Sequence, residues 1–198
     1  MRLRLIPCAV LLCALPADGS NALLTPPVIQ ALTAIDAIPS RASLNDAFGS
    51  QTSFGSLLSI ATDRTVDLGI GLRAIRALPA YCPAAPQTCG AGTPAHDALS
   101  SLVDSLASPD TPQDLLRLRA AAEALGVTHS GLADDADKLM ALLGNASRDV
   151  RATVVGAIRN ICSKTAIIPL GDFFFHEPSL QVKFAINAAL RDLARCPG

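Results

Sequence analysis

Residues 150–158 read VRATVVGAI, and residues 182–190 read VKFAINAAL. Both stretches place aliphatic side chains at positions i, i+4, i+7 and i+8, which in the first stretch are Val150, Val154, Ala157 and Ile158. Side chains with this spacing lie along one side of an α-helix. The second stretch repeats the pattern from its first residue onward. The two stretches therefore predict two amphipathic helices at equivalent positions of a repeated unit.

An Ala–aliphatic pair at the end of this pattern occurs four times along the chain. The pairs are Ala77-Leu78, Ala124-Leu125, Ala157-Ile158 and Ala189-Leu190. In residue numbers, the steps between their alanines are 47, 33 and 32 (124 − 77, 157 − 124 and 189 − 157). The long first step contains an insertion at residues 80–93, without which the step is 33 (47 − 14). A fixed period of this length is typical of stacked helical hairpins, each of which buries its apolar face only against its neighbours. We therefore predict an all-α fold, an α-solenoid of about four hairpins.

The sequence divides into three expected segments. Residues 1–22 have the features of a cleaved signal peptide, with two arginines, an apolar core at residues 5–15 and a small-x-small site that ends at Ala22. That apolar core spans only about half of a bilayer, so no integral membrane segment is expected after cleavage. Residues 23–42 are expected to form an N-terminal capping helix and linker, and residues 43–198 the repeat domain. The repeats are expected at about 43–79, 94–126, 132–163 and 164–195.

Four cysteines lie outside the expected signal peptide: Cys82, Cys89, Cys162 and Cys196. An even number in an exported chain indicates disulfides, and four cysteines allow three pairings. Cys82 and Cys89 flank a Pro-rich loop, which favours a local bridge and leaves Cys162 to pair with Cys196. The repeat register places Cys162 level with Ala194, which supports the second pair. Metal binding is the weaker alternative, because no C-x-x-C spacing is present.

Composition excludes several classes of function. Without Arg2, Arg4 and Asp18 the chain carries 14 basic and 16 acidic residues, a net charge of −2, so no nucleic-acid partner is expected. The chain has no Trp and one Tyr, which does not suit an aromatic-lined ligand pocket. Arginine far outnumbers lysine, which is associated with GC-rich bacterial genomes. The expected signal peptide and the even number of cysteines predict an exported protein of the periplasm or the extracellular space.

Local signals predict where several helices begin and end. Ser43 and Asp46 have the spacing of a capping box. Gly126 and Gly144 stand where a left-handed residue would close the preceding helix. Pro169 is expected to kink the first helix of the last repeat or to delay its start.

Glycines and phenylalanines give three further expectations. Gly49 and Gly55 interrupt the first helix of the first repeat, which is expected to be broken. Gly71 is expected to mark a close helix contact. The run Phe173–Phe175 covers too wide an arc for all three rings to face one core stripe, so at least one is exposed or is covered at the end of the stack.

A basic residue follows the first apolar position of each pattern: Arg151 follows Val150, and Lys183 follows Val182. Together with the Ala–aliphatic pairs, this resembles the HEAT-repeat family. The resemblance covers roughly residues 43–195. It implies a right-handed superhelix of helical hairpins, with the second helices lining a concave face that binds partners. Gly71 and Leu118 depart from the pattern, so the resemblance does not imply a continuous ladder of arginines through the first two repeats.

Patterns of catalytic or metal-binding residues are scarce. The chain has no G-x-S-x-G, G-x-x-x-x-G-K or H-E-x-x-H motif. His176-Glu177 resembles one of the several His–Glu pairs of iron-dependent HEAT-repeat hydroxylases, but one pair supplies too few ligands for a di-metal site. The acidic cluster at residues 134–137 lacks the spacing of a calcium loop and is expected to stabilise a helix start. We therefore expect no catalytic residues, no metal site and no cofactor.

The two helices of each hairpin differ in charge. The second helices carry 11 basic and 5 acidic residues, and the first helices carry 2 basic and 8 acidic residues. Guanidinium groups in clusters favour carboxylate or phosphate partners. The residues expected to bind a partner are Arg73, Arg76, Arg119, Arg151, Arg159, Lys183 and Arg191. The alternative is that the two layers of helices pair with each other, which contributes little stability per pair.

The sequence thus favours a non-enzymatic, exported interaction or scaffold module that binds a protein or another anionic partner through its second helices. The alternative is an enzyme or an enzyme-maturation subunit, such as a HEAT-like lyase or a metal-dependent hydroxylase.

Overall fold

The computed structural model describes residues 21–34, 37–49, 53–83 and 89–197, and all regular structure in these ranges is helical. The signal peptide expected at residues 1–22 lies almost entirely outside them. The α-helices are α1 (Pro26–Thr33), α2 (Arg41–Phe48), α3 (Ser53–Thr62), α4 (Leu68–Ala77), α5 (Pro94–Ser105), α6 (Pro112–Val127), α7 (Ala133–Ala141), α8 (Arg148–Ile161), α9 (Ile167–His176) and α10 (Leu180–Leu193). Short 3-10 turns occupy Asn21–Leu23, Leu78–Tyr81, Leu142–Gly144 and Lys164–Ala166. No helix of the described residues combines the length and the apolar character needed to cross a membrane.

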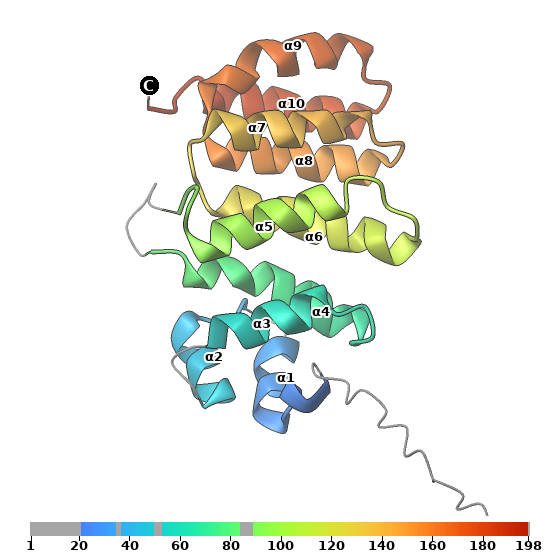
Figure 1. The fold of residues 1–198 in the computed structure, drawn as a ribbon. Coiled ribbons are helices and arrows are strands. Elements are labelled where there is room, and N and C mark those ends of the chain that lie inside the picture. Colours follow the sequence, from blue (N-terminus) through green and yellow to red (C-terminus); the bar gives the residue numbers. More distant parts are fainter. Residues whose placement is uncertain (1–20, 35–36, 50–52, 84–88, 198) are drawn as a thin grey trace, which may run out of the picture.

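The helices stack in the order of the chain (Figure 1). One layer consists of α4, α6, α8 and α10, and each of these packs on the next. The helices that precede them, α3, α5, α7 and α9, lie in front of this layer in Figure 1. At the blue end of the stack, α1 packs on α2 and α4, where the sequence predicts an N-terminal helix.

The repeated aliphatic stripe forms the centre of the core. Val150, Val154 and Ile158 are completely buried in α8, and Val182 and Ile186 are completely buried in α10. Burying one such side chain contributes about 1.5–3 kcal/mol. Buried aliphatic side chains also occur in α4 and α6, so this contribution is spread along the whole layer of α4, α6, α8 and α10.

Gly126 does not end α6, contrary to the expectation from the sequence. The helix continues to Val127, and a Cβ at Gly126 would lie 2.6 Å from the Cα of Ala157 in α8. The glycine therefore serves the close approach of two helices rather than a left-handed cap. Gly144 was also expected to be left-handed, but it belongs to a 3-10 turn and its φ is not positive.

The first helix expected from the sequence is broken at Gly49, as predicted, but not at Gly55, which lies inside α3. Gly49 adopts φ 64° and ends α2, and α3 starts at Ser53. The capping box predicted at Ser43 is wrong, because α2 begins one turn earlier. Ser40 is the N-cap, and its hydroxyl accepts a hydrogen bond from the backbone N–H of Ser43.

The last repeat accommodates its proline by a late start. A 3-10 turn precedes α9, which begins at Ile167, so Pro169 lies in the first turn of the helix. Backbone N–H groups in that turn have no partner within the helix, and the missing N–H of proline costs little there.

Two disulfides join Cys82 to Cys89 and Cys162 to Cys196, the pairings that the sequence favoured. Their Cα atoms are 5.1 Å and 5.6 Å apart. The second bridge ties the end of α8 to the end of α10. Cys162 itself closes α8 in the left-handed conformation with φ 66°. Structural disulfides of this kind are typical of proteins in oxidising compartments.

Candidate functional site

An open groove of about 430 Å³ lies on the layer of second helices, where α4, α6 and α8 meet. Three of the seven expected partner-binding residues line it, one from each helix: Arg76, Arg119 and Arg159. The rest of the lining is Glu123, Thr153, Gly156, Ala157 and Asn160. The stack of helices thus brings together side chains of α4, α6 and α8, which lie far apart in the sequence.

Nε donates a hydrogen bond in Arg76 and Arg119, and in Arg159 it lies within ion-pair distance of a carboxylate. Nε of Arg76 donates to Glu123 at 2.8 Å, and Nε of Arg119 donates to the Thr153 hydroxyl at 3.4 Å. Nε of Arg159 lies 3.8 Å from the Asp192 carboxylate. The terminal nitrogens of all three donate no hydrogen bond to another residue within the described part of the chain. Paired terminal N–H groups are the donors that bind a carboxylate or phosphate in bidentate geometry.

The groove is positively charged and has an open floor. Three arginines and one glutamate give its lining a net charge of +2. A Cβ added at Gly156 would meet no atom within 4 Å, so the floor at this position has room for part of a ligand. A concave site lined by one sign of charge concentrates oppositely charged ligands near it.

Arg151 does not join this groove. Its Nε and Nη2 atoms donate to the two carboxylate oxygens of Glu177 at 2.7 and 2.8 Å, and Nη1 donates to the backbone carbonyls of Asn145 and Ala146. The Glu177 side chain has no exposed surface. The hydrogen bonds from Arg151 hold the pKa of Glu177 below its ordinary value, and those to Glu177 raise the pKa of Arg151. The structure gives Arg151 an internal role that joins α8 to the end of α9.

The other three expected binding residues lie apart from the groove. Arg73 is half-buried on α4. Lys183 on α10 places its ammonium 5.3 Å from the centre of the Phe174 ring. Arg191 donates from Nε to the carbonyl of Asn187 in its own helix. The structure thus divides the seven residues into a group of three and four separate positions.

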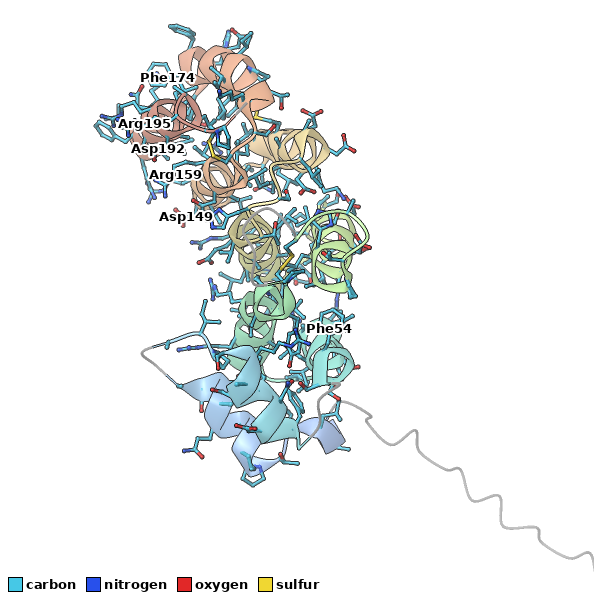
Figure 2. The ribbon with its side chains drawn as sticks, turned by 90° about the vertical axis from the view of Figure 1, so that its left-hand side faces the viewer. Phe54, Asp149, Arg159, Phe174, Asp192 and Arg195 are labelled. Carbon is cyan, nitrogen blue, oxygen red and sulfur yellow. A yellow bond between two sulfur atoms is a disulfide. The ribbon has the colours of Figure 1, made fainter. Side chains whose placement is uncertain are left out.

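Charge pairing runs mainly along each layer of helices. Arg76–Glu123 and Arg159–Asp192 join successive second helices, and Lys138–Asp104 joins α7 to α5 in the other layer. Arg151–Glu177 links α8 to the end of α9, and Arg117 on α6 lies close to Asp63, which follows α3. Figure 2 shows Asp149, Arg159, Asp192 and Arg195 along one side of the molecule, below Phe174.

A buried polar network joins α5 to α7. Nε2 of His96 lies 3.0 and 2.9 Å from the carboxylate oxygens of Asp135, which also accepts a hydrogen bond from the Ser130 hydroxyl. All three side chains are at most 8% exposed. The carboxylate separates the serine from the imidazole, so the histidine cannot take the proton from the hydroxyl as in nucleophilic catalysis. Asp134 and Asp135 lie in the first turn of α7, as the sequence predicted, and Asp135 is in addition the partner of His96.

The remaining histidines bind backbone carbonyls. Nδ1 of His176 lies 3.0 Å from the carbonyl of Asp172, while the adjacent Glu177 faces Arg151. Nδ1 of His129 lies 2.7 Å from the carbonyl of Asn160. In the ranges that the structure describes, no three or more His, Cys, Asp or Glu side chains are grouped so that they could hold a metal ion.

No family model matches the chain, and neither a curated protein nor a solved structure was found to be similar to it.

Proposed function

We propose that the protein is a non-enzymatic, exported interaction module with a HEAT-like α-solenoid fold. The regular spacing of the Ala–aliphatic pairs, the successive packing of α4, α6, α8 and α10, and the two disulfides support this proposal. In this proposal the second helices form the binding face, and the partner is a protein segment or another molecule that presents carboxylate or phosphate groups.

The groove lined by Arg76, Arg119 and Arg159 is the observation that carries the proposal. Arg76 and Arg119 are held by hydrogen bonds at Nε, so their terminal nitrogens are oriented before a ligand arrives. Orientation in advance lowers the entropy cost of binding. Binding by these residues therefore depends on positive charge and on free space above Gly156.

The test separates charge from space. Gly156→Leu would fill the groove without changing its charge, and Gly156→Ala is the matched control, since a Cβ fits there. Arg119→Glu reverses a groove charge whose hydrogen bond to Thr153 is 3.4 Å long. Arg148→Glu makes the same charge change at a side chain that is 68% exposed and outside the groove.

Binding of a fluorescent glutamate-rich peptide is measured by anisotropy at low salt, because such attraction is screened as salt rises. We expect Gly156→Leu and Arg119→Glu to weaken binding at least about tenfold, a loss of about 1.4 kcal/mol, while Gly156→Ala and Arg148→Glu bind as the wild type does. Equal weakening by Arg119→Glu and Arg148→Glu would show that the peptide responds only to net charge, and the groove would then be rejected as the binding site.

A further inference from the structure

A cleft runs between α3 and α5, two successive helices of the layer that lies in front in Figure 1. Its wider part, about 530 Å³, follows α5 from Pro94 to Ser105. Its deeper part, about 250 Å³, lies at the end of α3 and is also lined by Ile75 of α4 and Arg117 of α6. Thr62, Leu102 and Ser105 line both parts, so the two form one continuous cleft.

The wider part offers few hydrogen bonds to a ligand. Its apolar lining is Leu58, Pro94, Ala98 and Leu102. Of its three hydroxyl side chains, Thr62 and Ser105 already donate to carbonyls of their own helices, at 2.9 Å each. A peptide backbone placed here would leave N–H and C=O groups without partners, whereas an alkyl chain needs none. The lining of this part therefore selects a hydrocarbon chain.

The deeper part contains a buried positive charge. Only 4% of Arg117 is exposed. A guanidinium group has five N–H donors, and those of Arg117 that are paired in the described residues donate to the backbone carbonyls of Ala61 and Asp63. Burial lowers the pKa of Arg117, and the opposite effect of the Asp114 and Asp63 charges does not cancel it. Because a buried charge is stabilised by a counter-charge, an anionic group in this part of the cleft is favourable.

The charges at the two ends of the cleft give a ligand its direction. Arg64 adds a second positive charge to the deeper part, and its partner Asp114, at 3.2 Å, lies outside the lining of both parts. Among the described residues, no acidic side chain lines the deeper part. The wider part includes the carboxylate of Asp97, eight residues or about 12 Å before Ser105 along α5. An acid group is therefore attracted to the arginine end and repelled from the other.

We propose that this cleft binds a fatty acid, with its carboxylate at Arg64 and Arg117 and its alkyl chain along α5. The helix has 12 residues and is about 18 Å long, so an extended alkyl chain can lie along it. The volume of the wider part is within the usual range for small-molecule sites, about 300–1,000 Å³. This site is separate from the groove of Arg76, Arg119 and Arg159, which lies on the other layer of helices.

Isothermal titration calorimetry of the oxidised chain with dodecanoate, below its micelle concentration, tests the proposal. The wild type should bind one molecule of dodecanoate per chain. Dodecylamine has the same chain with the opposite charge and should bind at least about tenfold more weakly, because its ammonium group would face two arginines. Absence of dodecanoate binding, or equal affinities for the acid and the amine, would overturn the proposal.

Two pairs of variants locate the site. Ser105→Phe narrows the junction of the two parts and should weaken dodecanoate binding at least about tenfold. Ser59→Phe is the matched control, because Ser59 is an exposed serine of α3 outside the cleft whose hydroxyl also donates within its own helix. Arg64→Gln should weaken binding about threefold, as expected for an exposed charge, while Arg148→Gln, at a similarly exposed arginine, should bind as the wild type does. Equal affinities within either pair would reject the cleft as the fatty-acid site.

Discussion

Arg117 fills the space that a side chain at Gly71 would occupy. A Cβ at Gly71 would lie 3.3 Å from Nη2 of Arg117, and only 4% of Arg117 is exposed. Nη1 and Nη2 donate to the carbonyls of Ala61 and Asp63, at 3.1 Å each. These carbonyls belong to the end of α3, where backbone acceptors lack partners within the helix and a positive charge is favourable. Arg117 on α6 therefore reaches past Gly71 of α4, which has no side chain, and binds the end of α3.

Replacing Arg117 by methionine should destabilise the protein strongly. The variant removes the two hydrogen bonds from the guanidinium to the carbonyls of Ala61 and Asp63, and hydrogen bonds to charged groups contribute about 1.5–3 kcal/mol each. We expect a loss of about 2–4 kcal/mol in the free energy of unfolding, measured by urea denaturation with the disulfides intact. Arg148→Met is the control, because its side chain is 68% exposed, and it should change stability by less than about 0.5 kcal/mol. Equal stability of the two variants would contradict the anchoring role of Arg117.

Two helical glycines should respond in opposite ways to alanine. Gly126→Ala places a Cβ 2.6 Å from the backbone of Ala157 and should cost about 1–3 kcal/mol, since α6 and α8 must move apart. Gly156→Ala meets no atom within 4 Å and should stabilise α8 by about 0.5–1 kcal/mol. Thermal unfolding of both variants measures the difference. The same sign for both changes would show that the contact between α6 and α8 is not as close as described.

These glycines and arginines show which parts of the fold the sequence could predict. The stripe at Val150, Val154 and Ile158 was visible because helix periodicity is a local property of the chain. The role of Gly126 was not, since it depends on Ala157, which belongs to the next repeat. Arg117 did give a signal, a charge at a stripe position, but its acceptors lie at the end of a helix in the preceding repeat.

The sequence predicted the helices of the candidate site but not the contacts within it. The charge pattern identified the second helices, but it did not show which arginines meet in one groove. Arg151 and Arg159 lie about two turns apart on one helix, and the first is held by Glu177 while the second lines the groove. The contact between His96 and Asp135 was not predictable, because the two residues are 39 positions apart and meet only in the folded chain.

The two disulfides should differ in their contribution to stability. In the chain-entropy account, a closed loop of about 35 residues contributes about 4 kcal/mol and one of about 8 residues contributes about 2.5 kcal/mol. Replacing Cys162 and Cys196 by serine should therefore lower the midpoint of urea unfolding more than replacing Cys82 and Cys89. The first pair also joins α8 to α10, so hydrogen exchange in α10 should rise only when that pair is removed. Faster exchange in α10 after loss of the Cys82–Cys89 bridge would contradict this assignment.

Acid should destabilise the protein in part through Glu177. Its pKa in the folded chain is lowered by the hydrogen bonds from Arg151, so the folded state binds a proton there less readily than the unfolded state does. The resulting stability is fully present above the unfolded pKa, about 4.3 for glutamate, and is lost as the pH falls through the folded value. Asp97, whose pKa is lowered by the hydrogen bond from His96, contributes in the same direction.

Glu177→Gln isolates the contribution of this carboxylate. The amide keeps the shape of the side chain and one acceptor for Arg151, but it does not titrate. At neutral pH the variant should be less stable than the wild type, because a buried arginine loses its counter-charge. The difference in unfolding free energy should shrink as the pH falls below about 4.3, since the wild-type carboxyl then takes up a proton as well. A difference that stays constant from neutral pH to pH values well below that point would show that the Arg151–Glu177 pair does not determine the acid sensitivity of the fold.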